Sequence, residues 1–301
     1  MLFEQIAHNK RKTTLIMVLF VVILTLVGAG LGYIFTDNPW IGIAIAFIAS
    51  LIYMFIVLRN PANMIMNMNH GKEIHEKDNP ELWHIVQDMA MVARVPMPRV
   101  FIIPDKSPNA FATGRDPKHS AVAVTQGLLD MMNREELEGV LGHEISHIRN
   151  YDILLSTVAV VLVGVISFIS GYASRYIWWF GGDHHSRDDN KDDNNPVIMI
   201  IKIVAIVFVL ILGPISASLV QMALSRNREY LADASSVDLT RDPQGLISAL
   251  TKIDKSQPMK KADPSSAGMY IEDPFHKKRG FSHLFDTHPA TSDRIKRLEK
   301  M

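Results

Sequence analysis

The chain has 301 residues and a formal net charge of +0, because 31 Lys and Arg offset 31 Asp and Glu. This balance gives no indication of a nucleic-acid partner, which usually shows as a basic excess. The absence of cysteine excludes disulfides, thiol catalysis and Cys-ligated metal sites. Hydrophobic residues make up 48% of the chain. That share is ordinary for a soluble protein, but here these residues are concentrated in a few long runs.

Four uncharged, apolar runs are long enough to span a membrane. They cover residues 14–35, 40–58, 153–172 and 203–224. Each can cross a hydrocarbon core of about 30 Å as a helix that rises roughly 1.5 Å per residue. The first run is too long for the apolar core of a cleaved signal peptide, and the short break at residues 35–39 predicts a helical hairpin. The sequence therefore predicts a polytopic four-helix membrane protein.

The charges beside these runs predict the orientation of the chain. Residues 173–196 form an acidic loop between the third and fourth runs, and we interpret His184 and His185 there as part of a solvated connector. Basic residues flank the other ends of the runs: Lys10, Arg11, Lys12, Arg59, Arg226 and Arg228. We therefore expect both termini and residues 59–152 to be cytoplasmic and the acidic loop to lie outside.

Two polar stretches, residues 59–152 and 225–301, are long enough together for one mostly helical α+β domain. The expected division of the chain is a membrane hairpin at 1–58, the first part of the polar domain at 59–152, two membrane helices with the acidic loop at 153–224, and the second part of the domain at 225–301. The pattern predicts helices at 79–93, 133–147, 242–254 and 289–300, strands at 99–104 and 120–125, an edge segment at 109–114 and a mobile loop at 256–279.

His143, Glu144 and His147 form an HExxH sequence on one of the predicted helices. Residues i and i+4 share a helix face, so the two imidazoles can bind one zinc ion at about 2.0–2.1 Å. Glu144 projects beside them, where it can take a proton from a water molecule at the metal. HExxH also occurs by chance on ordinary surface helices, so the interpretation depends on a third ligand.

Glu229 is the strongest candidate for the third ligand, because Asp233 follows it by one helical turn. This Glu-x-x-x-Asp spacing matches the glutamate-zincin arrangement, in which the Glu binds zinc and the Asp supports a ligating His. The metzincin pattern is excluded, since Asn150 and Ile153 stand where it needs Gly and His. His288 is the main competitor, because a site of three histidines is also chemically sound. Two imidazoles and one carboxylate favour zinc, with one ion per chain.

Three segments together resemble the HtpX-type heat-shock membrane proteases, which are relatives of the CAAX-prenyl endopeptidases. The segments are Gly142–His147, Ser225–Asp233, and His288–Pro289 with Arg294–Ile295. The resemblance runs from the N-terminal hairpin to the closing helix. It implies an integral zinc endopeptidase of the bacterial cytoplasmic membrane, active on the cytoplasmic side against unfolded or damaged membrane proteins, in quality control and the stress response.

The resemblance also assigns roles to individual residues. The zinc ligands would be His143, His147 and Glu229, with Glu144 as the general base and Asp233 as support for a ligating His. It places His288 and Arg294 near the oxyanion of the tetrahedral intermediate. The segment that would pair with the substrate backbone consists of Asn109, Ala110, Phe111 and Ala112.

Two other functions remain open. A site-2-type intramembrane protease also uses HExxH, but within a span, whereas Arg149, Asn150 and Asp152 separate His147 from the third apolar run. A zinc-sensing membrane protein without catalysis would need the ligands but not Glu144. The expected partners are substrate proteins and the lipid bilayer, with no nucleic acid, and the sequence does not indicate an oligomeric state.

Overall fold

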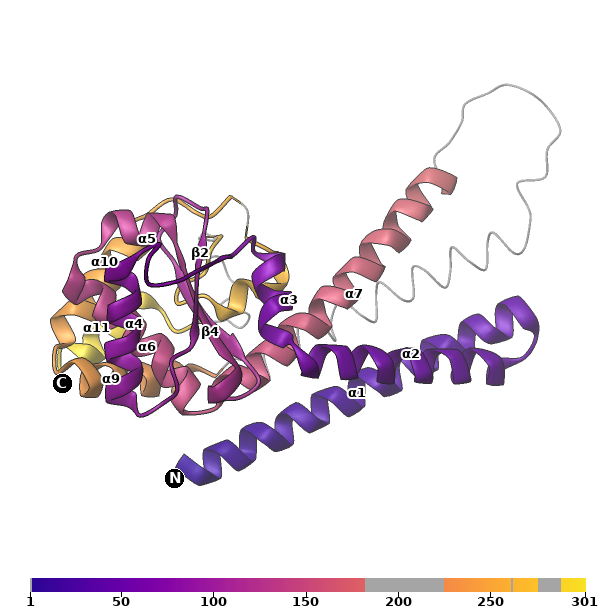
Figure 1. The fold of residues 1–301 in the computed structure, drawn as a ribbon. Helices are drawn as coiled ribbons and strands as arrows, with labels where there is room; N and C mark the ends of the chain where they lie inside the picture. Colours follow the sequence, from indigo (N-terminus) through magenta and orange to yellow (C-terminus); the bar gives the residue numbers. More distant parts are fainter. Residues whose placement is uncertain (1, 182–224, 261, 276–287) are drawn as a thin grey trace, which may run out of the picture. The chain divides into compact units, whose positions relative to one another are not determined.

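The computed structural model describes residues 2–181, 225–260, 262–275 and 288–301 (Figure 1). The chain divides into two compact units. One comprises Met1–Leu15, Ile56–Val161 and Val220–Met301, and the other comprises Ile16–Phe55 and Leu162–Leu219. The candidate site lies entirely within the first unit.

The N-terminal part is a helical hairpin of α1 (Leu2–Thr36) and α2 (Pro39–Arg59). Two stretches of it, Ala7–Tyr33 and Pro39–Arg59, are long and apolar enough to cross a membrane. The two helices approach closely at Gly28, which has no side chain. A Cβ atom there would lie 2.5 Å from the carbonyl oxygen of Gly42. The predicted hairpin is therefore confirmed as a structural element.

The third apolar run lies within α7 (Asp152–Gly181), which follows α6 (Arg134–Arg149) after a bend of 88°. The prediction that a loop starts at residue 173 is wrong, because α7 continues to Gly181. No Pro or Gly interrupts residues 172–180, so nothing local ends the helix earlier. The rest of the acidic loop, with His184 and His185, and the fourth run at 203–224 lie outside the described residues.

A four-stranded sheet has the order β1 (Lys72–Ile74), β2 (Arg99–Ile103), β4 (Ser120–Thr125) and β3 (Ala110–Gly114). The β2–β4 pair is parallel, and β1 and β3 join antiparallel at the two edges. The predicted strands and edge segment are thus present. The three-residue strand β1 was not predicted, because it is too short to show a period-two pattern.

Short helices surround this sheet in the first unit. They are α3 (Pro61–Met68), α4 (Pro80–Ala93), α5 (Gln126–Met131), α9 (Arg226–Thr240), α10 (Pro243–Asp254) and α11 (Thr291–Leu298). The predicted capping box of α6 is present: the Asn133 side chain accepts from the Glu136 N–H, and Glu136 accepts from the Asn133 N–H. This arrangement satisfies two N–H groups that the first turn of a helix leaves free.

Close packing of α6 against α9 and α10 positions the site. Gly139 has no side chain, and a Cβ atom there would lie 2.7 Å from the backbone nitrogen of Leu246 in α10. Ser236 of α9 donates a hydrogen bond of 2.6 Å to the Gly139 carbonyl. The second half of α9 thus lies beside the first half of α6, and the contacts of His143 with Glu229 and Asp233 join the first turns of α9 to the second half of α6.

The predicted mobile loop at 256–279 contains regular structure over part of its length, and its residues 261 and 276–279 lie outside the described residues. It contains the 3₁₀ helix η2 (Pro264–Met269), and Tyr270 is fully buried. The cause is Asn69, whose side-chain oxygen accepts from the hydroxyls of Ser266 and Tyr270. A single buried amide 197 or more residues away in the chain could not be read from local composition.

Candidate metal centre

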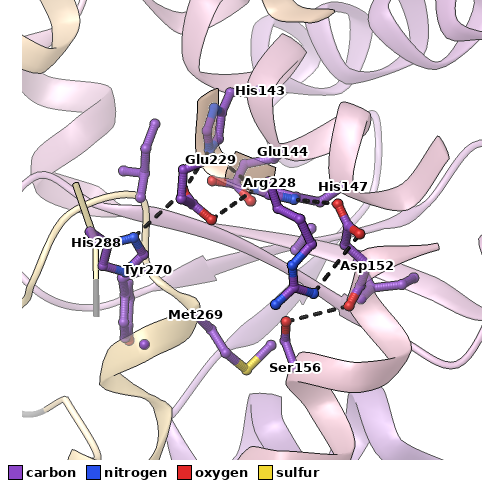
Figure 2. A pocket seen from close by; sticks show the side chains of 14 residues that line it. His143, Glu144, His147, Asp152, Ser156, Arg228, Glu229, Met269, Tyr270 and His288 are labelled. Carbon is purple, nitrogen blue, oxygen red and sulfur yellow. Dashed lines mark hydrogen bonds and ion pairs between the residues drawn. The ribbon is translucent and has the colours of Figure 1, made fainter. Parts of the chain in front are cut away.

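Three side chains that can bind a metal converge between α6 and α9 (Figure 2). His143 and His147 lie one turn apart on α6, and their Nε2 atoms are 3.2 Å apart. The Glu229 carboxylate lies 3.6 Å from the Nε2 atom of His143 and 3.8 Å from that of His147. The three ligand atoms fall within 4.8 Å of one another, so one ion can contact them all.

Carboxylates behind the two imidazoles indicate which ring nitrogen holds the proton. His143 Nδ1 lies 2.9 Å from Asp233 Oδ1, and His147 Nδ1 lies 3.2 Å from Asp152 Oδ2. With protons on both Nδ1 atoms, the Nε2 lone pairs point at each other and at the Glu229 carboxylate. Three electron-pair donors facing one point repel one another unless a cation lies between them. The residues present therefore fit a metal ion.

Glu229 and Asp233 are held in the charged form that these roles require. Burial opposes ionisation of Glu229, but the imidazoles of His143, His288 and His147 beside it keep its pKa well below the ordinary value. Burial also opposes ionisation of Asp233, but Arg294 and His143 lower its pKa to about 2. Two donors of the Arg294 guanidinium bind Asp233 at 2.9 Å and 2.6 Å. Asp233 is thus a fixed anion behind His143.

Asp152 has the matching position behind His147, and it also connects the site to the N-terminal helix. Its Oδ1 atom accepts a hydrogen bond of 2.8 Å from the Asn9 side chain of α1. Both residues are buried, and Asn9 belongs to the same compact unit as the site. The orientation of a candidate metal ligand therefore depends on a residue before the first apolar run.

Glu144 is placed to act as a general base. It is 1% exposed, and burial raises its pKa. The neighbouring His143 and His147 act in the opposite direction, but the pKa of Glu144 stays above its ordinary value. The backbone N–H of Ala112 in β3 hydrogen-bonds its carboxylate, whereas its Oε1 atom has no partner among the described residues. Glu144 lines a cavity of about 30 Å³, which is room for roughly two water molecules. A water molecule can therefore reach both the carboxylate and the three candidate ligands.

His288 and Arg294 occupy different positions relative to this cavity. His288 lines it, with Nδ1 3.5 Å from Glu229 Oε2, and neither ring nitrogen has a hydrogen-bond partner among the described residues. Arg294 is fully buried behind His143, and besides its two bonds to Asp233 it donates to the Ile271 carbonyl at 2.7 Å. The His288 ring is therefore available to a substrate, whereas each of the three Arg294 guanidinium nitrogens already donates to Asp233 or Ile271.

The predicted substrate segment is the edge strand β3 together with Asn109 before it. The Asn109 side chain donates to the Glu272 carbonyl, and the Ala110 carbonyl accepts from the Ile271 N–H, so this end of the edge is already paired. Phe111 is buried with its ring edge-on to Tyr270, at a centroid distance of 4.9 Å. Ala112 alone of the four lines the cavity.

Two further cavity residues were not assigned to the site from the sequence. In the sequence, Asp152 is one of the polar residues between His147 and the third apolar run, and Arg228 is one of the cations that flank the fourth. The Arg228 side chain is 14% exposed and lines the cavity, so it is not a solvated surface cation. The sequence could have indicated that Arg228 belongs to the site, because it directly precedes Glu229.

Comparisons with known proteins show which family the chain is similar to. The model of peptidase family M48 matches residues 76–301. The chain is 77% identical over 301 residues to "Protease HtpX homolog" of Lactobacillus helveticus and 57% identical over 303 residues to that of Levilactobacillus brevis, with each chain covered completely. It also aligns with the structure "Crystal Structure of S. mikatae Ste24p" at 20% identity and a TM-score of 0.49, covering 94% of this chain and 61% of the other.

The family model covers well over half of the chain, and the HtpX homologues match it from end to end. The helices long enough to span a membrane and the His–His–Glu cluster agree with the same family. The chain therefore belongs to peptidase family M48 and is a membrane metalloprotease.

Proposed function

We propose that this chain is a zinc endopeptidase of the bacterial cytoplasmic membrane that cleaves unfolded or damaged membrane proteins on the cytoplasmic side. The observation that carries the proposal is the convergence of His143, His147 and Glu229 beside a buried carboxyl group, Glu144. A metal-sensing protein would need the three ligands, but it has no use for a base with a raised pKa beside them.

The donor set favours zinc over other divalent ions, since two imidazoles and one carboxylate are the ligands of many catalytic zinc sites. When bound, zinc acts as a Lewis acid that polarises the scissile carbonyl and activates water. His143, His147 and Glu229 would hold the ion. Asp233 and Asp152 would fix the two imidazoles with their Nε2 atoms toward it.

The chain's own residues supply the proton transfers. Glu144 takes a proton from the attacking water and later delivers it to the leaving amine, and the raised pKa of its buried carboxyl suits both steps. We assign His288 as a donor to the oxyanion, because its ring nitrogens face the cavity without partners. Arg294 acts indirectly, because it binds Asp233, which in turn orients His143. Ala112 marks the part of the β3 edge where a substrate strand can add.

The cytoplasmic side and the substrate class have separate support. The basic residues beside the apolar runs favour cytoplasmic termini, and α6 carries too many charged residues in its first two turns to lie within a bilayer. This argues against a site-2-type intramembrane protease. The relatives named HtpX homologues come from bacteria, and the resemblance to heat-shock membrane proteases favours damaged membrane proteins as substrates.

The proposal is tested by cleavage of unfolded casein with full-length protein in detergent. We expect zinc-dependent activity that a chelator removes and zinc restores. Glu144→Gln keeps the shape of the side chain but removes the base, so we expect about one zinc per chain and a loss of about 10²- to 10⁴-fold in activity. A zinc-loaded wild-type protein without peptidase activity would refute the proposed endopeptidase function. Full activity in zinc-loaded Glu144→Gln would refute the role of Glu144 as general base.

A further inference from the structure

Arg228 is the one Lys or Arg among the described residues that line the cavity. It stands directly before Glu229 on α9, and successive side chains on a helix diverge by about 100°. The Arg228 guanidinium therefore extends away from the candidate ligands, toward Asp152 and Ser156 at the start of α7 (Figure 2).

The partners of Arg228 leave it with an unused donor. Its Nη1 atom lies 3.9 Å from Asp152 Oδ1, too far for a hydrogen bond, and it is buried without any hydrogen-bond partner among the described residues. At this distance Asp152 does not accept from Nη1, and each of its two oxygens already accepts a hydrogen bond, from Asn9 and from His147. A buried charged donor without an acceptor is costly, and such groups usually have a partner.

The charges around the cavity indicate what that partner is. Three carboxylates already line it, from Glu144, Asp152 and Glu229. A fourth carboxylate, brought by an acidic substrate side chain, would be repelled by these three groups at short range. A carbonyl oxygen is neutral, accepts a charge-assisted hydrogen bond and is present in every residue of a peptide.

We infer that Arg228 binds the substrate backbone, donating from Nη1 to a peptide carbonyl oxygen close to the cleaved bond but distinct from the scissile carbonyl. The role rests on the proposed peptidase function and deepens it. Arg228 and the β3 edge at Ala112 would hold the peptide at two points, and Asp152 would aim the guanidinium while its oxygens remain occupied by Asn9 and His147.

The test is a double-mutant cycle between Arg228→Met and the peptide backbone. A peptide that the wild-type protein cleaves is prepared with one carbonyl oxygen at a time replaced by sulfur, a weaker acceptor, at the bonds that flank the cleaved one. For the all-oxygen peptide, Arg228→Met should lower kcat/KM by about 10- to 100-fold, with metal content unchanged. At one position, the sulfur peptide should lower kcat/KM of the wild type by about tenfold and change that of Arg228→Met little.

Two further variants complete the design. Arg241→Met, on a side chain that is 82% exposed beyond the other end of α9, should behave as the wild type with every peptide. Arg228→Lys keeps the charge near Asp152 but changes the geometry of the donors, and it replaces Arg228→Met in the cycle if that variant does not fold with its metal.

The outcomes separate the two claims. If the metal-loaded wild type cleaves no peptide, the proposed function fails and the role of Arg228 fails with it. If the wild type cleaves the all-oxygen peptide but every sulfur substitution has the same effect in the wild type and in the metal-loaded Arg228 variant, the proposed function stands and the inference is overturned. Coupling at one position supports it.

Discussion

Glu229 and His288 lie against each other at the edge of the cavity, and their chemistry decides which one binds the metal. The Glu229 carboxylate is within reach of the Nε2 atoms of both HExxH histidines, whereas His288 contacts only Glu229 among these ligands. A low pKa keeps Glu229 ionised, which a metal ligand requires. The geometry therefore favours Glu229, although three histidines would be an equally sound donor set.

Replacing each residue with Ala separates the two roles. Glu229→Ala should lose stoichiometric metal, because two imidazoles alone bind an ion weakly. His288→Ala should keep about one metal per chain and lose about 100-fold in kcat, as expected for removal of one oxyanion donor. Metal analysis of the purified variants, together with peptide cleavage, checks both results. Metal retained in Glu229→Ala and lost in His288→Ala would make His288 the ligand.

The parts of the candidate site that the sequence predicts lie on α6 and α9. Its capping box, its HExxH face and the Glu-x-x-x-Asp spacing on α9 are local patterns, so each could be read from a few neighbouring residues. The supporting contacts are not local: Asp152 meets Asn9 across 143 positions, and Asn69 meets Tyr270 across 201. Such contacts depend on how helices pack, for which a single sequence gives no periodic signal.

The contact between α1 and the start of α7 predicts that the N-terminal helix influences metal binding. Asn9→Ala removes the donor that holds Asp152, so His147 loses part of its orientation and the dissociation constant for zinc should rise about tenfold. Competition with a chelating dye measures this constant without relying on activity.

Thr13→Ala is the matched control for Asn9→Ala. Thr13 is also buried on α1, but within the described part of the chain its hydroxyl bonds only the Asn9 carbonyl of its own helix. Its replacement should leave the dissociation constant unchanged. Equal weakening in both variants would mean that the helix is merely destabilised, and wild-type affinity in Asn9→Ala would show that Asp152 holds His147 unaided.

At the scale of the whole molecule, the site draws its residues from segments on both sides of the apolar runs. Asn9 precedes the first run, the HExxH helix lies between the second and third, and Glu229 follows the fourth. All three positions meet in one compact unit, so the segments that carry them must lie on the same side of the membrane. An even number of crossings between each pair satisfies this requirement, and the four-span prediction has two between consecutive positions.

The absence of cysteine from the chain makes this topology testable without background labelling. Single-cysteine variants at Asn38 and Asp189 should react in intact cells with a maleimide that does not cross membranes, because both positions are predicted to lie outside. Asn38 is exposed in the turn between α1 and α2, and Asp189 belongs to the acidic loop beyond the described residues. Variants at the exposed Lys77 and Lys300 should react only after the membrane is permeabilised.

Each variant should also retain casein cleavage, so that a labelled molecule is a folded one. The four-span arrangement predicts one crossing between Asp189 and the C-terminus. If Asp189→Cys and Lys300→Cys were labelled on the same side, the number of crossings between them would be even, and the four-span arrangement would have to be abandoned.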